Sequence, residues 1–157
     1  MPLLKTLCIL GIGNTLRSDD GIGAFVCRQL EKLNLDGLTI HIIHQLQTEW
    51  LDELAGFNSV LIIDAAVNEN DDIAIIPIDR ARTISTNISH HISINLLADL
   101  MTTMHNSRVH FYTCAIPGEN FDFGESLSAN GQKNAERAVE LVTSWIRENE
   151  FIHAQDA

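Results

Sequence analysis

Hydrophobic residues along this chain form two kinds of pattern, and the two kinds alternate. Short runs in which most positions are apolar predict strands that are covered on both faces, as in a parallel sheet. These runs lie at residues 6–10, 38–43, 60–63, 73–78 and 109–116. Pro77 has no backbone N–H to donate, so the fourth strand is expected at a sheet edge or at a strand end.

The segments between these runs carry apolar residues at intervals of three and four positions, which predicts amphipathic helices. One helix starts at Ile22 and is closed by residues 34–37, and another covers residues 96–104. A short helix is expected with Thr48 as its N-cap and Gly56 just past its end. The last helix runs from about residue 129 to residue 148.

The alternation of strands and helices predicts an α/β fold. We expect a single three-layer domain, with a twisted, mostly parallel five-stranded sheet and helices on both faces. A chain of 157 residues is long enough for one such domain and short for two. Residues 1–150 are assigned to this domain, and residues 151–157 are expected to fray as a C-terminal tail.

Composition narrows the classes of function. The 21 acidic and 10 basic residues give a net charge of -11, which argues against binding to nucleic acid. No run approaches the ~18 apolar residues of a membrane helix, and the first residues lack a secretory cleavage site, so we expect a cytoplasmic protein without membrane contact. Cys8, Cys27 and Cys114 have no C-x-x-C spacing and are interpreted as buried thiols.

A glycine-rich turn, residues 11–23, follows the first predicted strand. It does not fit the dinucleotide fingerprint, because Leu16 stands where the third glycine would fall, and no Gly-Lys-Ser/Thr follows as in a Walker loop. The adjacent carboxylates of Asp19 and Asp20 would also repel a pyrophosphate. One aspartate is enough to cap the helix at Ile22, so Asp19 is assigned to that cap and Asp20 to a site in the crevice beyond the strand.

Two further elements are expected at the same edge of the sheet. Asp64 ends the third predicted strand, so it meets Asp20 if the first and third strands are neighbours; the alternative is an ordinary turn residue. Ser89 is expected to cap the next helix, which places His90 and His91 in its first turn, either as structural residues or as a ligand. Two carboxylates and one imidazole with open positions suit a divalent metal such as nickel or zinc.

Four blocks of this sequence resemble the hydrogenase maturation peptidases, a family of nickel-dependent endopeptidases, and together they span nearly the whole chain. Residues 11–23 match the family's opening G-x-G-N…D-[DE]-x-x-G signature. Residues 61–65 match the strand that ends in an acidic metal ligand, and residues 89–91 match a turn that supplies a histidine ligand. Residues 115–119 with 123–128 are similar to the family's last strand and the entry to its last helix.

The resemblance implies that Asp20, Asp64 and His91 form the metal-contacting and catalytic set. His91 is the match rather than His90, because the family often has proline at the position of His90, and proline is tolerated at a first helical position. Residues 45–51 resemble a Q-L-x-P-E-L variant of part of the family. Thr48 replaces its proline, which affects the subgroup but not the family.

The function implied is that of an aspartic-type or metal-dependent endopeptidase that removes the C-terminal extension of a nickel-iron hydrogenase large-subunit precursor. Nickel would be that of the precursor and would serve as the recognition element. One alternative is a non-catalytic metal-binding maturation chaperone of the same fold. Another is a flavodoxin-like binder of a small ligand, which the missing phosphate loop and the acidic crevice disfavour. The sequence shows no defensible Ser-His-Asp or Cys-His set.

Overall fold

The structure is a computed structural model that describes residues 5–35, 37–67, 72–78, 99, 101–103 and 109–151. Five strands form one sheet in the order β2-β1-β3-β5-β4. They are β1 (Leu7–Ile12), β2 (Leu38–Ile43), β3 (Ser59–Ala66), β4 (Ile75–Pro77) and β5 (His110–Pro117). All neighbours pair in parallel except β4, which runs antiparallel to β5 at the edge. The predicted mostly parallel five-stranded sheet is confirmed.

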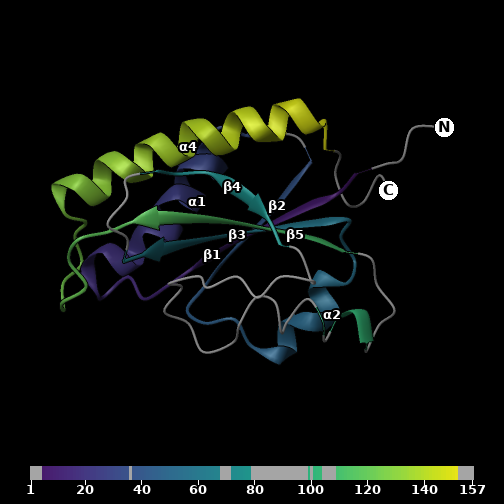
Figure 1. The fold of residues 1–157 in the computed structure, drawn as a ribbon, viewed down its shortest axis with the longest axis horizontal. Helices are drawn as coiled ribbons and strands as arrows, with labels where there is room; N and C mark the ends of the chain where they lie inside the picture. Colours follow the sequence, from purple (N-terminus) through teal and green to yellow (C-terminus); the bar gives the residue numbers. More distant parts are fainter. Residues whose placement is uncertain are drawn as a thin grey trace.

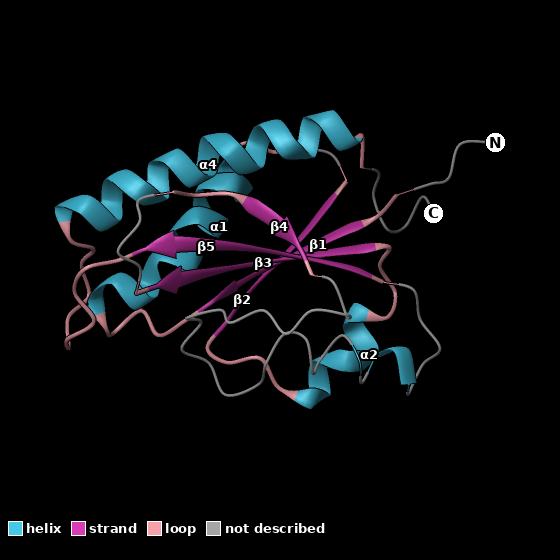
Figure 2. Ribbon diagram, viewed as in Figure 1, coloured by secondary structure: helices cyan, strands magenta, loops and turns pink. Residues whose placement is uncertain are grey.

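Helices cover both faces of the sheet, as expected for three layers (Figures 1 and 2). One face carries α1 (Ile22–Lys32) and the long α4 (Ala129–Asn149), which contact each other. The other face carries the short 3-10 helix η2 (Thr48–Trp50) and α2 (Leu51–Leu54). Residues 99 and 101–103 are helical, in agreement with the predicted helix at 96–104, whose other positions lie outside the described residues. Residues 152–157 of the predicted tail also lie outside them.

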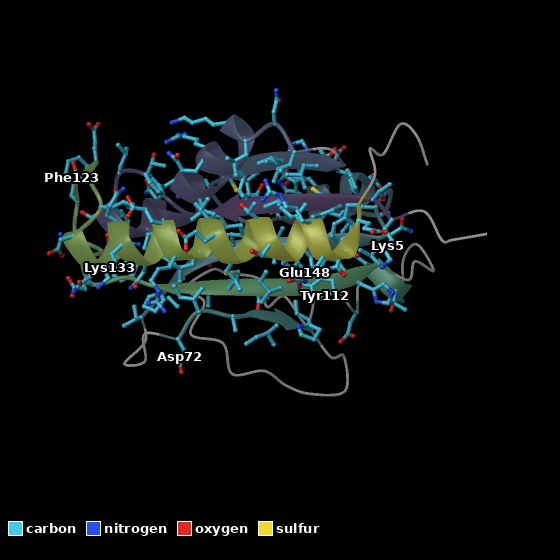
Figure 3. All side chains as sticks on the ribbon, turned by 90° about the horizontal axis from the view of Figure 1, so that it is seen from above. Lys5, Asp72, Tyr112, Phe123, Lys133 and Glu148 are labelled. Atoms are coloured by element: carbon cyan, nitrogen blue, oxygen red, sulfur yellow. The ribbon has the colours of Figure 1, made fainter. Side chains whose placement is uncertain are left out.

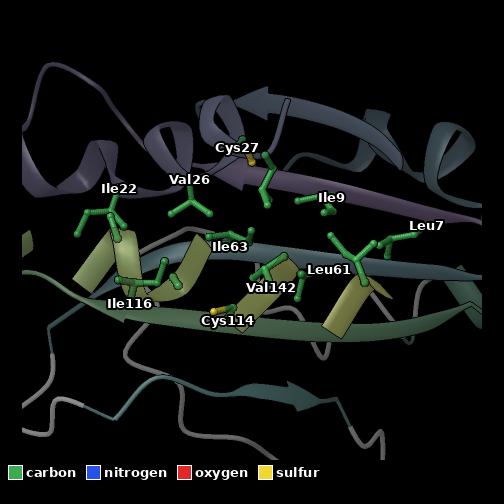
Figure 4. Packing of buried hydrophobic residues seen from close by; sticks show 14 of the residues in the cluster. Leu7, Ile9, Ile22, Val26, Cys27, Leu61, Ile63, Cys114, Ile116 and Val142 are labelled. Carbon is green, nitrogen blue, oxygen red and sulfur yellow. The ribbon is translucent and has the colours of Figure 1, made fainter. Parts of the chain in front are cut away.

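Two hydrophobic clusters hold the layers together. The cluster between the sheet and the α1/α4 layer includes Ile9, Ile63 and Val142, and Figure 4 shows side chains from strands and helices meeting there. The cluster on the opposite face includes Leu10, Ile62 and Met101. Alternate residues of one strand therefore point into different clusters, which explains why the central strands are apolar at nearly every position.

Two predicted strand ends are wrong. We expected the first strand to stop at Leu10, but β1 continues through Gly11 and Ile12, which pair with β2. We expected Asp64 to end the third strand, but β3 continues for two residues, which pair with β5. Pairing with neighbours extends a strand beyond the point where its own sequence changes character. Pro77 does lie in the edge strand, as its missing donor requires.

The strand order reverses between β1 and β3. From β1 the chain crosses to β2 through α1 on one face, and from β2 it crosses to β3 through η2 and α2 on the other face. β1 and β3 are therefore neighbours, and the strands that follow them in the chain, β2 and β4, lie on opposite sides of this pair. In open α/β sheets, sites form beyond the carboxyl ends of such a pair.

Candidate active site at the carboxyl ends of β1 and β3

The loop after β1 turns back sharply at Gly13. Its φ of +146° is one that side-chain-bearing residues rarely adopt, and a Cβ atom there would overlap the carbonyl oxygen of Asp20. Asp20 belongs to the 3-10 helix η1 (Ser18–Gly21), and its Oδ2 accepts a hydrogen bond of 2.7 Å from the Asn14 amide. The turn at Gly13 thus brings Asp20 back beside the end of β1.

The start of α1 lies directly against the ends of both central strands. A Cβ atom on Gly23 would stand 2.6 Å from the Ile63 carbonyl oxygen and 2.9 Å from that of Ile12. Only a residue without a side chain fits so close to two backbones. Because η1 immediately precedes α1, it also contacts β3.

The structure therefore places Asp20 and Asp64 at the same end of the same strand pair. Asp64 lies opposite Ile12 in the parallel register of β1 and β3. Asp20 and Asp64 are 2% and 1% exposed, so both carboxyl groups are almost completely removed from solvent. Burial of a carboxylate costs free energy unless hydrogen bonds or a cation compensate it.

The predicted histidine of the set, His91, lies outside the described residues, as do Ser89 and His90. The structure thus brings two of the three predicted residues together and leaves the imidazole unplaced. Among the described residues, no group of three or more His, Cys, Asp or Glu side chains is arranged to hold a metal ion.

The assignment of Asp19 to the cap of α1 is wrong. The N-cap of α1 is Gly21, and no side chain caps that helix. The side chain of Asp19, which is fully buried, turns to residues about a hundred positions away. It accepts hydrogen bonds from the amides of Glu119, Asn120 and Ser128 and from the Ser128 hydroxyl, at 2.7–3.1 Å.

These contacts determine the charge state of Asp19. Burial raises the pKa of its carboxyl group, but the hydrogen bonds from Ser128, Glu119 and Asn120 lower it more, so the pKa falls below its ordinary value. Asp19 is therefore a buried carboxylate. It serves the segment that leads into α4, where Ser128 is the N-cap and its Oγ accepts a hydrogen bond from the Gly131 amide.

Asp19 is one contact of several between two loops, which we name the 13–21 loop and the 118–128 loop. The Ser18 amide donates to the Gly124 carbonyl at 2.8 Å, and the Gly124 amide donates to the Leu16 carbonyl at 2.8 Å. The Ser18 hydroxyl donates to the Asp122 carbonyl at 2.8 Å. Ser18 has a φ of +50°, a costly conformation for a residue with a side chain, and these bonds compensate it. These hydrogen bonds join the two loops to each other.

Sequence reasoning missed this partnership between the loops. The signals were Ser128 ahead of the last helix and three glycines, Gly118, Gly124 and Gly131, where a Cβ atom would meet Asp19 or Ser18. A glycine or a serine in the sequence does not name a partner a hundred residues away.

The three cysteines are buried, as predicted. Burial raises the pKa of Cys8, Cys27 and Cys114 to about 12, so each thiol stays protonated at neutral pH and is a poor nucleophile. His41 lies in β2 and contacts Glu53, at 3.2 Å, away from the two aspartates. In the described part of the chain, none of the three thiols is therefore an activated nucleophile.

The sequence and the fold can both be compared with known proteins. No protein-family model and no curated protein matches the sequence. Solved structures do match. The hydrogenase maturating endopeptidase HybD from E. coli has a TM-score of 0.73 and 22% identity, and the match covers 92% of this chain and 94% of that one. The maturation protease HybD from Thermococcus kodakarensis has a TM-score of 0.71 and 19% identity, with 89% and 98% covered.

A third similar structure is the maturation protease HycI from Thermococcus kodakarensis, with a TM-score of 0.68, 21% identity, and 91% and 93% of the two chains covered. This chain has the fold of the hydrogenase maturation proteases over nearly its whole length. No helix in the described part is both long and apolar enough to cross a membrane.

Proposed function

We propose that this protein is an endopeptidase that removes the C-terminal extension of a nickel-iron hydrogenase large-subunit precursor once nickel has been inserted. One observation carries the proposal: Asp20 and Asp64, buried and far apart in sequence, lie at the same end of the neighbouring strands β1 and β3. The fold shared with maturation proteases and the glycine-rich signature at residues 11–23 support the same assignment.

The donor set fits a divalent metal that arrives with the substrate. Two carboxylates and one imidazole, from Asp20, Asp64 and His91, are ligands that nickel accepts, and they leave coordination positions open. Such an ion beside the scissile bond polarises the carbonyl group or activates a water. Nickel is here a part of the precursor rather than a resident cofactor of the enzyme.

Electrostatics gives a reason why a loaded precursor would be selected. Two acidic side chains at one edge attract a divalent cation more strongly than one does, because both negative charges act on it. A precursor without metal lacks this attraction, so it would bind less tightly. The Asn14 amide holds Asp20 in place, while the ladder of β3 with β1 and β5 holds the backbone of Asp64.

The test is a processing assay with purified protein and a large-subunit precursor, prepared with and without nickel. We expect the wild-type protein to shorten only the loaded precursor, as seen by gel mobility and intact mass. Asp20→Asn, Asp64→Asn and His91→Ala should each reduce the rate at least a hundredfold, which is of the order of losing one group that stabilises the transition state. Asp52→Asn, on the exposed surface of α2, is the matched control and should process normally.

Two outcomes would contradict the proposal. A folded Asp20→Asn or Asp64→Asn variant that processes at the wild-type rate removes that residue from the site. A wild-type protein that binds the loaded precursor but never shortens it is a maturation chaperone of this fold, not a peptidase.

A further inference from the structure

One large hydrophobic side chain near the site is almost fully exposed to solvent. Phe123 is 86% exposed, more than any other exposed large hydrophobic residue in the described part of the chain. It lies on the 118–128 loop, at the end of the molecule where α4 begins (Figure 3). Phe121, two residues earlier, packs against the core instead. Burial of a phenylalanine ring stabilises a fold, and Phe123 contributes no such stabilisation.

The exposure of Phe123 does not come from a loose loop. Both neighbours are hydrogen-bonded to the 13–21 loop, the Asp122 carbonyl through the Ser18 hydroxyl and Gly124 through its amide and carbonyl groups. Asp19 holds both ends of the same loop, at Glu119 and Ser128. The fold therefore fixes the backbone around Phe123 while leaving the ring outside.

A second exposed apolar residue lies on the neighbouring 13–21 loop, just before the bridge between Arg17 and Gly124. The Gly124 amide donates to the Leu16 carbonyl, so Leu16 lies next to the residue that follows Phe123. Leu16 is 46% exposed. Leu16 belongs to the same 13–21 loop as Asp20, four positions before it.

The charge around the pair indicates what it would bind. The 118–128 loop carries three exposed carboxylates, Glu119, Asp122 and Glu125, and no basic residue. One exposed basic residue, Arg17, lies beside them and donates from Nε to the Phe121 carbonyl, so the charge around the pair is negative on balance. A negative surrounding is complementary to an apolar segment flanked by basic side chains. A fixed aromatic residue is also the usual anchor of a protein–protein contact.

We propose that Phe123 and Leu16 form a docking surface for an apolar segment of the precursor polypeptide that is flanked by basic residues. Binding at this surface positions the precursor for reaction at Asp20 and Asp64. The inference rests on the proposed function and adds the residues that hold the substrate outside the reacting centre.

The experiment measures the dissociation constant for the nickel-loaded precursor, and KM and kcat for its cleavage, on single variants. We expect Phe123→Ala to raise the dissociation constant and KM about tenfold, as for an aromatic anchor, and to change kcat less than twofold. Leu16→Ala should raise both about threefold. Leu33→Ala is the matched control, because Leu33 is also 46% exposed but lies at the other end of α1, and it should behave as wild type.

A second set of measurements tests whether the acidic residues around Phe123 attract the basic residues of the precursor. The double variant Asp122→Asn, Glu125→Gln should slow association several-fold at low salt and flatten its dependence on ionic strength. Thermal unfolding of every variant checks folding, and Phe123→Ala should unfold at the wild-type temperature, since the ring contributes little to the core.

Three results would overturn the docking surface. If the wild type shortens the precursor and Phe123→Ala matches it in dissociation constant and KM, the surface is wrong while the proposed function stands. If Leu33→Ala weakens binding as much as Leu16→Ala, the effect is not specific to this end. If light scattering shows a wild-type dimer that Phe123→Ala dissociates, the surface belongs to a second copy of this chain. Failure of the wild type to shorten the precursor is a separate result, and it concerns the proposed function.

Discussion

The two ends of the central strands are built in different ways. At the amino end, Thr6 and Asn58 connect the starts of β1 and β3 by three hydrogen bonds of 2.9–3.2 Å. At the carboxyl end lie three buried aspartates, and one of them, Asp19, finds its hydrogen-bond donors about a hundred residues further along the chain. The amino end is joined by neutral polar groups of adjacent strands. The carboxyl end carries several buried acidic residues, and such a concentration of buried acidic groups is typical of a functional site.

The largest expected effect comes from Gly13→Ala, which tests whether the backbone turn defines the carboxyl end. The added Cβ atom would overlap the Asp20 carbonyl oxygen at a strained φ, so we expect a loss of about 4 kcal/mol or more in the free energy of unfolding. Urea unfolding provides the measurement. Gly56→Ala, whose nearest contact would be 3.6 Å, should be neutral or slightly stabilising. Equal losses in the two variants would refute the special role of Gly13.

Asp19→Asn comes next, because an amide cannot accept all the hydrogen bonds that the carboxylate accepts. We expect a loss of about 2–3 kcal/mol at neutral pH, as for hydrogen bonds to a charged group. Protection of the Glu119 and Asn120 amides against hydrogen exchange should also fall. A variant that keeps both stability and protection would show that Asp19 does not hold the 118–128 loop.

The same variant gives a pH dependence with a definite sign. The pKa of Asp19 is lowered in the folded state, so its stabilisation is present above its ordinary value of 3.8 and is lost as pH falls through the lower folded value. The difference in unfolding free energy between wild type and Asp19→Asn should therefore be full at neutral pH and narrow below pH 3.8. Unfolding in urea across this pH range is the measurement. A difference that widens on acidification would contradict the assignment.

Asn58→Ala is the counterpart at the amino end. It removes the two bonds that Asn58 Oδ1 accepts from Thr6, while the bond from the Asn58 amide to the Thr6 hydroxyl remains, so about 1 kcal/mol of stability should be lost. Precursor processing should stay at the wild-type rate once the variant is folded. A loss of processing without unfolding would show that the two ends are coupled, and the contrast between them would fail.

The smallest effect is expected from Glu53→Gln, which removes the pair with His41 on the surface of the α2 layer. Both side chains are partly exposed, at 50% and 32%, and water screens such pairs strongly. The free energy of unfolding should change by less than about 0.5 kcal/mol. A larger change in the same urea experiment would mean that charged side chains also stabilise the α2 face of the molecule.

The sequence predicted the elements whose pattern is local. The strand at 38–43 and the helix starting at Ile22 agree with β2 and α1, because each depends on apolar spacing within a few residues. The strand that was expected to end at Asp64 is longer in the structure, since its last residues are held by pairing with β5. Local pattern carries no information about a partner strand.

The candidate site also has features that the sequence could predict and features that it could not. The joint position of Asp20 and Asp64 at one sheet edge could be predicted, because parallel strands bring their carboxyl ends together. The partners of Asp19 could not, because adjacency to Asp20 suggested the nearer helix, while its hydrogen-bond donors lie in a loop ahead of the last helix. His91 stays a prediction from the resemblance.

The hydrogen bond between Asp19 and Ser128 has a consequence for the nascent chain on the ribosome. The two residues are 109 positions apart, so at about 5–20 residues per second a ribosome needs about 5–20 s to add Ser128 after Asp19. During that interval the aspartate has no donor from the loop that it will later hold. Translation itself thus delays the moment at which this end of the molecule can close, and an unfinished chain cannot present the finished surface to another protein.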